Sequence, residues 1–420
     1  MKICVFYNLP PGGAKRLAYS CARGLRNRGH FIDLVTTDTQ ENELFSIRPF
    51  AHQVLEYQAL MDRSIKRFKP YVLWRYLEFL RKACFMWTLR ACHKRMASEM
   101  QGRGYDLIFV HACVHTQSPF LLRYLTAPTI YYSNEPLRIV YDESPKESIR
   151  SRNPLIRATI ALCKPAEYFE KLLLKRVDRT NIRSAPHVLT SSEHTRNRLF
   201  RAYGISSTVC YPGIENDRFR PLYLKRKDYV LSVGTIAPNK RHDFVINALA
   251  GIEAMVRPRL VIVANFVIVD CLEQVRDLAV KQNVDLAIKI LVPEEELVRT
   301  YNEARAVIYT PEQEPFGLVP LEAMACGTPV IGVREGGIPE TIKDGCSGIL
   351  IGRNEQECTV AIERILWDDN LCRQLGQNGP DYVRRCWSLE GRTRELEAAL
   401  TRIKQKCTAG RGEMGERSGD

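Results

Sequence analysis

Short apolar runs alternate with longer amphipathic stretches along both halves of the chain. In the first half this pattern predicts a helix over 14–29 and strands at 2–7, 30–37, 106–112, 127–133 and 185–192. In the second half it predicts strands at 229–234, 259–268, 287–292, 305–310 and 328–333. Helical segments are expected there at 241–256, 271–283, 294–303, 319–326, 337–343 and 355–367. Such alternation is typical of parallel sheets covered by helices.

A turn-rich, charged stretch separates the two series, and its sequence at 211–228 is YPGIENDRFRPLYLKRKD. A chain of 420 residues suits two cores better than one. We therefore predict an α/β protein with two doubly wound, Rossmann-like domains, 1–210 and 229–387, facing each other across a cleft. A last helix over 388–405 is expected to pack back on the first domain, and a disordered tail is expected over 408–420.

The composition is that of a globular protein, with 45% hydrophobic and 26% charged residues. No apolar run reaches the length of roughly 18 residues that a membrane helix needs. The opening MKICVFYNLPPGG predicts a first strand followed by a turn, and not a signal peptide. The 14 cysteines show no metal-ligand spacing, which indicates small buried side chains in a reducing compartment. The expected location is the cytoplasm, either free or at the inner face of the membrane.

Positive charge is concentrated in the first half of the chain. Residues 1–220 hold 35 Lys and Arg against 19 Asp and Glu, whereas residues 221–420 hold 26 against 29. The basic part therefore favours an anionic partner. Within a predicted helical region at 60–103, eleven Lys and Arg between Arg63 and Arg103 are interleaved with aromatic residues. This pattern suits peripheral contact with an anionic membrane, single-stranded nucleic acid, or a hairpin with its aromatics packed inside. We expect no nucleic acid, and the other two interpretations stay open.

Two turns follow predicted strands, at the carboxyl edge where doubly wound folds bind ligands. The first contains Gly12 and Gly13, which would let a ligand approach the backbone closely, although a tight turn alone also explains them. The second leads into the helix LVPLEAMACG, whose first amides, on Leu318 and Val319, have no partner within the helix. These amides could bind a diphosphate.

Two glutamates accompany the second turn. Glu314 lies on the turn itself, where its carboxylate can accept from a sugar hydroxyl. Glu322 lies inside the helix among apolar neighbours, where an idle carboxylate would be costly, and it could reach a nucleoside ribose. The alternative is that both glutamates simply favour the positive end of a helix, and the apolar neighbours of Glu322 weaken that explanation.

Residues 314–340, EPFGLVPLEAMACGTPVIGVREGGIPE, resemble the donor-site motif of family 4 glycosyltransferases, which are retaining enzymes of the GT-B fold. The resemblance covers nearly the whole chain, because four further segments also match the family. They are GGAKRLAYSCARGLRNRGHFIDLVT, YDLIFVHA, SSEHTRNRLFRAYGISSTVCYPGIENDRFRP and VGTIAPNKRHDFVINAL. The joint pattern is far more specific than any single segment.

The resemblance implies a role for each matching residue of the donor site. Glu314 would bind hydroxyls of the transferred sugar, and Phe316 and Gly317 would shape the sugar pocket. The amides of Leu318 and Val319 would hold the diphosphate, and Glu322 the ribose.

Further matches lie elsewhere along the chain. Lys240 would neutralise the leaving diphosphate, Gly12 and Gly13 would line the opposite wall, and His111 would lie near the acceptor. No D-x-D sequence occurs, which agrees with a metal-independent reaction that needs no cofactor beyond the nucleotide sugar.

The chain departs from the family pattern at a few positions. Thr235 stands where many members have an arginine, and Asn239 replaces another arginine, for which the adjacent Arg241 could compensate. Asn134 replaces a histidine that touches the donor sugar, so this residue can hydrogen-bond but cannot titrate. The glycine of a loop near the base is absent from IKILVPEEEL.

The resemblance implies a hexosyltransferase that uses GDP-mannose first and UDP-glucose second. A glycan or lipid-linked acceptor, for a cell-envelope polysaccharide or glycolipid, is expected on the basic domain. One alternative is another GT-B enzyme, of the sucrose-synthesis or phosphorylase type. The other is a protein that binds sugar nucleotides with weakened catalysis.

Overall fold

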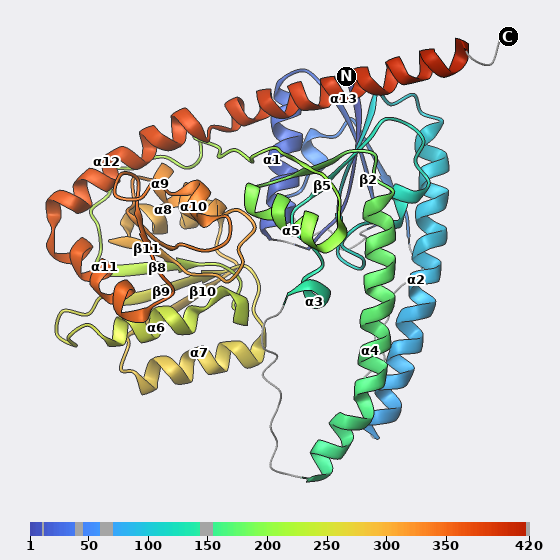
Figure 1. Ribbon diagram of the computed structural model, residues 1–420. Coiled ribbons are helices and arrows are strands. Elements are labelled where there is room, and N and C mark those ends of the chain that lie inside the picture. The colour runs from blue at the N-terminus through green and yellow to red at the C-terminus, as the bar shows by residue number, and fades with distance from the viewer. Residues whose placement is uncertain (11, 38–44, 59–69, 143–153, 417–420) are drawn as a thin grey trace.

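The computed structural model describes residues 1–10, 12–37, 45–58, 70–142 and 154–416, and in these the chain forms two parallel sheets (Figure 1). The first sheet has the order β3-β2-β1-β4-β5-β6-β7. Its strands are β1 (Lys2–Asn8), β2 (Phe31–Thr36), β3 (Gln53–Glu56), β4 (Leu107–Cys113), β5 (Thr129–Ser133), β6 (Val188–Thr190) and β7 (Thr208–Val209). The central strands consist almost entirely of buried apolar residues, as strands covered on both faces must.

Helices pack on both faces of the first sheet, and two of them extend far beyond it (Figure 1). The helices of this domain are α1 (Gly13–Asn27), α2 (Tyr71–Gln101), α3 (Arg138–Tyr141), α4 (Pro154–Arg183) and α5 (Glu193–Tyr203), with short 3₁₀ helices η1 (Arg48–Phe50) and η2 (Phe120–Arg123). No helix in the described ranges is long and apolar enough to cross a membrane.

The second sheet has the order β10-β9-β8-β11-β12-β13. Its strands are β8 (Tyr229–Val233), β9 (Arg259–Ala264), β10 (Leu286–Ile290), β11 (Ala306–Tyr309), β12 (Val330–Val333) and β13 (Ile349–Ile351). Around it lie η3 (Pro238–Lys240), α6 (His242–Ala250), α7 (Val269–Lys281), α8 (Glu294–Glu303), α9 (Leu318–Ala325), α10 (Ile338–Thr341), α11 (Glu355–Trp367) and α12 (Asp369–Cys386). The prediction of two Rossmann-like α/β domains is confirmed.

Both sheets reverse their strand order at one position, and these positions locate the ligand crevice. In the first sheet the reversal lies between β1 and β4, and in the second between β8 and β11. Ligands bind outside the carboxyl ends of the strands at such switch points. Gly12–Gly13 follow β1, and the Glu314 turn follows β11, so the topology brings both predicted turns to the crevice edge.

The chain passes between the domains at two adjacent points. The amide of Ile214 donates to Trp387 O (2.8 Å), and the amide of Leu389 donates back to Ile214 O (2.8 Å). From there α13 (Leu389–Glu416) runs along α1 and buries Leu396 and Leu400 in the core of the first domain (Figure 1). The helix therefore continues through 408–416, where the sequence predicted a disordered tail, because a helix anchored by packing propagates at little cost.

Several elements were absent from the sequence prediction. They are β3, β7, β13, α3, α4, α5, α12 and the short 3₁₀ helices. In α12 the cause is local, since Gly376, Gly379 and Pro380 interrupt the helical pattern. The two glycines are required by packing: a Cβ at Gly379 would lie 2.8 Å from Met324 O of α9, and one at Gly376 would lie 2.8 Å from Gly327 O. The predicted helical region at 60–103 is α2, and residues 60–69 lie outside the described residues.

Candidate functional site

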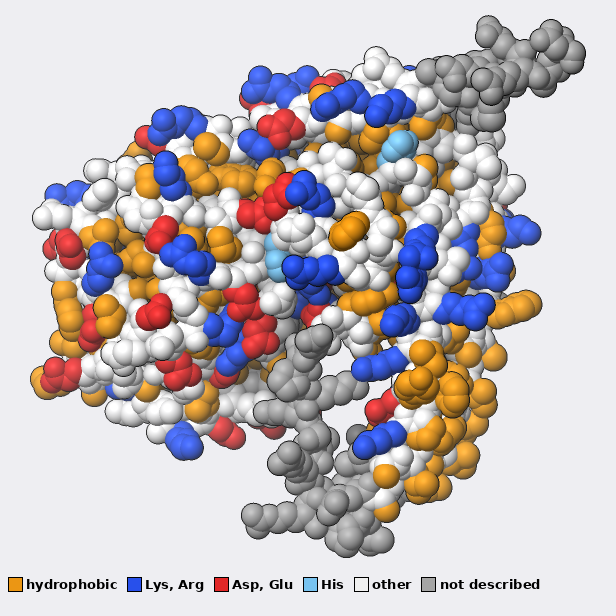
Figure 2. Space-filling view, in the orientation of Figure 1, with side chains coloured by type: hydrophobic (Ala, Val, Ile, Leu, Met, Phe, Trp, Pro, Cys, Tyr) orange, Lys and Arg blue, Asp and Glu red, His pale blue; other side chains and the backbone are white. Residues whose placement is uncertain are grey.

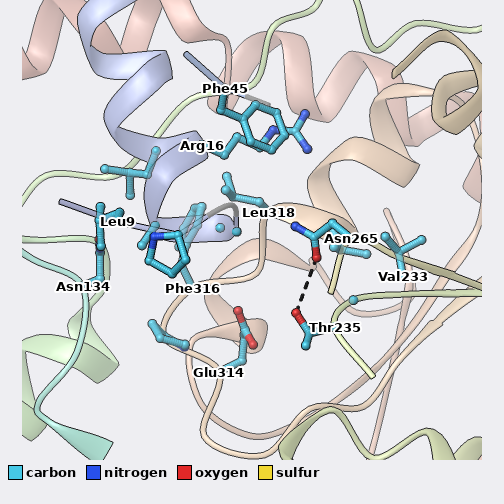
Figure 3. Close-up of a pocket in the computed structure, with 18 of the residues that line it drawn as sticks. Leu9, Arg16, Phe45, Asn134, Val233, Thr235, Asn265, Glu314, Phe316 and Leu318 are labelled. Atoms are coloured by element: carbon cyan, nitrogen blue, oxygen red, sulfur yellow. Dashed lines mark hydrogen bonds between the residues drawn. The ribbon is translucent and has the colours of Figure 1, made fainter. Parts of the chain in front are cut away.

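A cleft of about 820 Å³ lies between the two domains, and residues of both line it. Figure 3 shows Leu9, Arg16 and Asn134 from the first domain facing Thr235 and Asn265 from the second, with the side chain of Glu314 pointing into the space between. Of the predicted site residues, those that line the cleft are Gly12, Gly13, Asn134, Lys240, Glu314, Phe316, Gly317, Leu318, Val319 and Glu322.

Helix α9 begins at the floor of this cleft with its first amides uncapped. Its N-cap residue, Gly317, has φ 112°, a left-handed conformation that favours glycine, and it offers no side chain to the helix. The amides of Leu318 and Val319 have no partner within the helix. They and the positive end of the helix dipole therefore face the cleft, as an anion site requires.

The turn before α9 is held tightly by a Gly-Gly pair that follows β12. The amide of Gly337 donates to Glu314 O (2.8 Å). A Cβ at Gly336 would lie 2.5 Å from the same oxygen, and one at Gly337 would lie 2.5 Å from Pro315 O. Glycine is needed at both positions so that the backbones can approach. This support was not predicted from the sequence, although the glycines lie within the motif.

Glu314 forms an ion pair with Lys240, which ends the 3₁₀ helix after β8. The Lys240 Nζ to Glu314 Oε2 distance is 2.8 Å, and the two side chains are 20% and 14% exposed. Burial pushes the pKa of Glu314 up, but Lys240 and Arg138 outweigh it and hold the pKa below its usual range. The carboxylate is therefore ionised at neutral pH and accepts hydrogen bonds only.

Glu322 is fully buried and has two partners, one from each domain. Arg16 Nη1 of α1 lies 2.5 Å from its Oε1, and Tyr301 Oη donates to its Oε2 (2.8 Å). Burial raises the pKa of Glu322 despite the nearby Arg16. The Arg16 guanidinium also stacks over Phe219, at 4.7 Å from the ring centroid. The sequence did not indicate Arg16, because its partner lies more than 300 residues away.

Asn134 follows β5 on the opposite wall and is 7% exposed. Both polar atoms of its side-chain amide lack a hydrogen-bond partner among the described residues. Buried amides are nearly always paired in folded proteins, so this amide is available for a ligand in the cleft.

Phe316 lines the cleft with a largely buried ring. The ring packs against Tyr211 and Trp387 at the domain crossing, with centroid separations of 6.0 and 5.4 Å. The Phe316 ring therefore connects the Glu314 turn to the segments where the chain passes between the domains.

Two predicted residues lie away from the cleft. His111 on β4 is fully buried between Phe109 and Tyr132, both ring nitrogens lack a partner among the described residues, and burial lowers its pKa to about 3. It is therefore neutral. Arg241 turns toward Asp243 (3.0 Å) and Glu312. Neither residue lines the cleft, and their proposed roles stay predictions.

A second ion pair on the first-domain side was also not predicted. Glu135 and Arg138, adjacent to Asn134, form a pair that lines the cleft, and burial raises the pKa of Glu135. Arg138 also donates to Gln313 O of the second domain (3.2 Å). Residues in the loop that follows a strand carry no periodic pattern, so only the fold shows that Glu135 and Arg138 lie near the Glu314 turn.

The N-terminus of α5 connects the two domains beside the turn that carries Glu314. Glu340 of α10 accepts from the amides of Glu193 and His194 (2.9 Å each) and from Tyr211 Oη (2.9 Å). Thr195 Oγ1 donates to Pro315 O (3.2 Å). A carboxylate at the N-terminus of a helix is favoured by its free amides and dipole. These contacts connect the turn that carries Glu314 to the first domain.

Two family models match adjoining parts of the chain. The model described as Glycosyltransferase Family 4 matches residues 11–218, and the model described as Glycosyl transferases group 1 matches residues 213–382. The matched ranges meet at the domain boundary and include the residues of both cleft walls.

Curated relatives match over part of the chain or at low identity. A D-inositol 3-phosphate glycosyltransferase of Streptomyces bingchenggensis is 30% identical over 48% of this chain and 50% of its own. A GDP-mannose-dependent alpha-(1-6)-phosphatidylinositol monomannoside mannosyltransferase of Mycolicibacterium smegmatis is 29% identical over 50% and 60%. An alpha-1,3/1,6-mannosyltransferase of Rhizomucor pusillus is 23% identical over 94% and 90%. The chain spans about half the length of the first relatives it matches.

Solved structures agree in fold. A sucrose-phosphate synthase of Thermosynechococcus elongatus superimposes with a TM-score of 0.73 at 19% identity, covering 96% of this chain and 99% of that chain. The Anabaena protein HepE, in complex with UDP and glucose, has a TM-score of 0.67 at 16% identity, covering 96% and 99%. These similarities show the GT-B fold. With the family models matching both halves of the chain, the protein belongs to glycosyltransferase family 4.

Proposed function

We propose that this protein transfers a hexose from a nucleotide diphosphate sugar to a glycan or lipid-linked acceptor, with retention of configuration. The observation that carries the proposal is the convergence in one cleft of the Glu314–Lys240 pair, the free amides of α9 and Glu322. Asn134, with its unpaired amide, faces them. This set complements a sugar, a diphosphate and a ribose in turn.

The residues can take the donor without giving up their present partners. Lys240 has three donor hydrogens, so it can hold Glu314 and a phosphate oxygen together. A carboxylate has about four acceptor sites. Glu322, which uses one oxygen for Arg16 and the other for Tyr301, can therefore still accept from ribose hydroxyls.

In the proposed reaction, the bond between the sugar C1 and the phosphate oxygen breaks while a bond from C1 to the acceptor oxygen forms on the same face. The acceptor proton passes to the leaving phosphate oxygen. Lys240 and the α9 amides stabilise the negative charge that develops on the diphosphate, and they are already in place before the reaction. Glu314 holds the sugar hydroxyls and fixes the position of C1.

Mannose is our first choice for the sugar. Two relatives are named as mannosyltransferases, one of them GDP-mannose-dependent, and their identities to this chain are 29% and 23%. The second choice is glucose from UDP-glucose, and a fold neighbour was solved with UDP and glucose. A lipid-linked acceptor is supported by the relative named for a phosphatidylinositol monomannoside.

A thermal-shift panel of GDP-mannose, UDP-glucose, UDP-GlcNAc and GDP tests the proposal. Saturation near 100 Kd stabilises a protein by about 2.7 kcal/mol, so the true donor should raise Tm by a few degrees. We expect GDP-mannose to give the largest rise. A larger rise with UDP-glucose would change the sugar and keep the function, whereas no rise with any of them would contradict the function itself.

Turnover of the bound donor separates the remaining alternatives. Binding without hydrolysis or transfer would indicate a non-catalytic sugar-nucleotide-binding protein. Turnover with inorganic phosphate as acceptor would indicate a phosphorolytic enzyme of the same fold.

We also propose that the reaction needs no metal, because Lys240 and the α9 amides supply the positive potential that a metal would provide at the diphosphate. Removing divalent metals with EDTA should change the rate by less than about twofold, since no Lewis acid is lost. The check is an initial-rate measurement with and without EDTA. A large loss that Mg²⁺ or Mn²⁺ restores would contradict this proposal.

A further inference from the structure

Helices α2 and α4 lie side by side and extend well beyond the first domain (Figure 1). Arg75 Nη2 and Lys82 Nζ of α2 bind the two oxygens of Glu170 on α4, at 2.5 and 2.7 Å. Only the last part of each helix packs on the sheet, where Met96, Met100 and Ile182 are buried in the core. At 1.5 Å per residue, helices of about 30 residues are roughly 45 Å long.

The far part of this helix pair, residues 71–87 and 158–174, leaves many of its large apolar side chains exposed. Nine of the 26 exposed large hydrophobic side chains in the described part of the chain lie here: Leu73, Tyr76, Leu77, Leu80, Trp87, Leu162, Tyr168, Phe169 and Leu172. Trp87 is 79% exposed. Figure 2 shows hydrophobic side chains gathered on the lower part of the pair. Contiguous exposed apolar patches mark interaction sites. We call these nine residues the apolar end.

Positive charge gathers on the near part of the same pair, residues 88–101 and 175–183. Seven Lys and Arg lie there against two acids, and one of the acids, Asp178, is buried and bound to Ser118 and Tyr203. We call these seven basic residues the basic collar. They are Arg90, Lys94, Arg95, Lys175, Arg176, Arg179 and Arg183. In the apolar part, by contrast, Arg75 and Lys82 share an ion pair with Glu170, and Arg81 pairs with Glu78.

We propose that the α2–α4 pair is a membrane-docking element that places its apolar end in the interfacial region of an anionic bilayer. Aromatic and aliphatic side chains favour the boundary between headgroups and acyl chains, and Lys and Arg above them bind lipid phosphates. This inference does not depend on the proposed glycosyl transfer. It replaces the expectation of contact through 60–103 alone, because α4 supplies four of the nine apolar residues.

A second copy of the chain is a weaker candidate for the same surface. Residues 73, 77, 80, 84 and 87 recur at every third or fourth position, and a partner helix could use such a stripe. Helices α2 and α4, however, carry thirteen Lys and Arg against five Asp and Glu. Two copies would bring these like charges together, whereas anionic lipid neutralises them.

Co-sedimentation of the full-length protein with vesicles tests the proposal. We expect binding to phosphatidylcholine vesicles that contain phosphatidylglycerol, little binding to phosphatidylcholine alone, and weakening by salt. Replacing Leu80, Trp87, Leu162 and Phe169 together with glutamine should lower the partition coefficient at least about tenfold. Replacing Lys94, Arg176 and Arg179 with glutamine should lower it on the order of a hundredfold.

A matched control removes four exposed apolar residues outside the pair, namely Phe200, Met255, Val280 and Trp367, each replaced with glutamine. This variant should bind vesicles as the native chain does. Equal losses in the control and in the apolar-end variant would overturn the proposal. A second result would also overturn it: light scattering shows that the native protein is a dimer and the apolar-end variant a monomer, and the native protein does not bind vesicles.

Tryptophan fluorescence distinguishes insertion from adsorption of charge alone. Phosphatidylglycerol vesicles with brominated acyl chains should quench the native protein, and Trp87→Phe should remove much of that quenching while sedimentation is retained. Bound protein with no quenching would contradict insertion of the apolar end. Neither measurement uses a sugar nucleotide, so failure here leaves the proposed transfer untouched.

Discussion

Replacing Glu314 with alanine is expected to lower sugar transfer on the order of a thousandfold while leaving binding of the nucleotide diphosphate nearly unchanged. The variant lacks the two charge-assisted hydrogen bonds that the carboxylate would accept from sugar hydroxyls, each contributing about 2 kcal/mol. About 1.4 kcal/mol corresponds to a factor of ten in rate. Lys240, freed from its partner at 2.8 Å, still faces the diphosphate. Initial rates with the identified donor and calorimetry with the nucleotide diphosphate measure the two effects.

Two further variants make this result specific. Glu314→Gln keeps the shape of the side chain and removes its charge, so it should lose less activity than the alanine variant. Glu296→Ala breaks an ion pair of the same 2.8 Å length, with Lys289, on the surface of the same domain. The Glu296→Ala variant should transfer sugar at the native rate. Unchanged turnover in Glu314→Ala would contradict the role proposed for Glu314.

Lys240→Ala should weaken donor binding on the order of a hundredfold, with little effect on the free nucleoside. The lost interaction is a charge-assisted one with the diphosphate, which contributes about 1.5–3 kcal/mol, and the upper end of that range is about a hundredfold in affinity. Calorimetry with the donor and the matching nucleoside measures the difference. Lys289→Ala is the matched control. Equal losses for donor and nucleoside would count against a phosphate role.

The same substitution should also change the pH dependence of transfer. Lys240 contributes to the low pKa of Glu314 against the opposing effect of burial, so removing it should raise that pKa. Transfer needs the ionised carboxylate, and it should therefore fall at a higher pH in Lys240→Ala than in the native protein as the solution is acidified. A pH–rate profile shows the shift, and superimposable acid limbs would argue that Lys240 does not act on Glu314.

Local pattern indicated most of the donor side of the cleft. Gly317, the α9 amides, Glu314 and Glu322 lie within nine residues, and strand, turn and helix follow one another there as the pattern predicts. Their proximity in space follows from their proximity in the chain. The position of Lys240 could be predicted for a related reason. Lys240 follows β8, which is the neighbour of β11, and neighbouring parallel strands end at the same edge of the sheet.

The opposite wall depended on contacts between distant parts of the chain. The pairing of Arg16 with Glu322, the contact of Arg138 with Gln313 O and the burial of His111 leave no periodic trace in the sequence. The exposure of the apolar end was hidden in the same way, because α2 is apolar on several sides and its pattern alone suits a packed helix equally well.

Apolar periodicity, turn glycines and the Glu-Pro-Phe-Gly motif are local properties, so the fold class with its two α/β domains could be predicted from the sequence, and a chemistry could be proposed for the Glu314 turn. Which groups meet across the cleft and which faces stay uncovered depends on contacts between residues far apart in the chain, so these features appear only in the folded protein. The glycines of α12 illustrate the difference. In the sequence they interrupt a helix, and in the structure they let that helix approach Met324 of α9, the helix whose amides face the cleft.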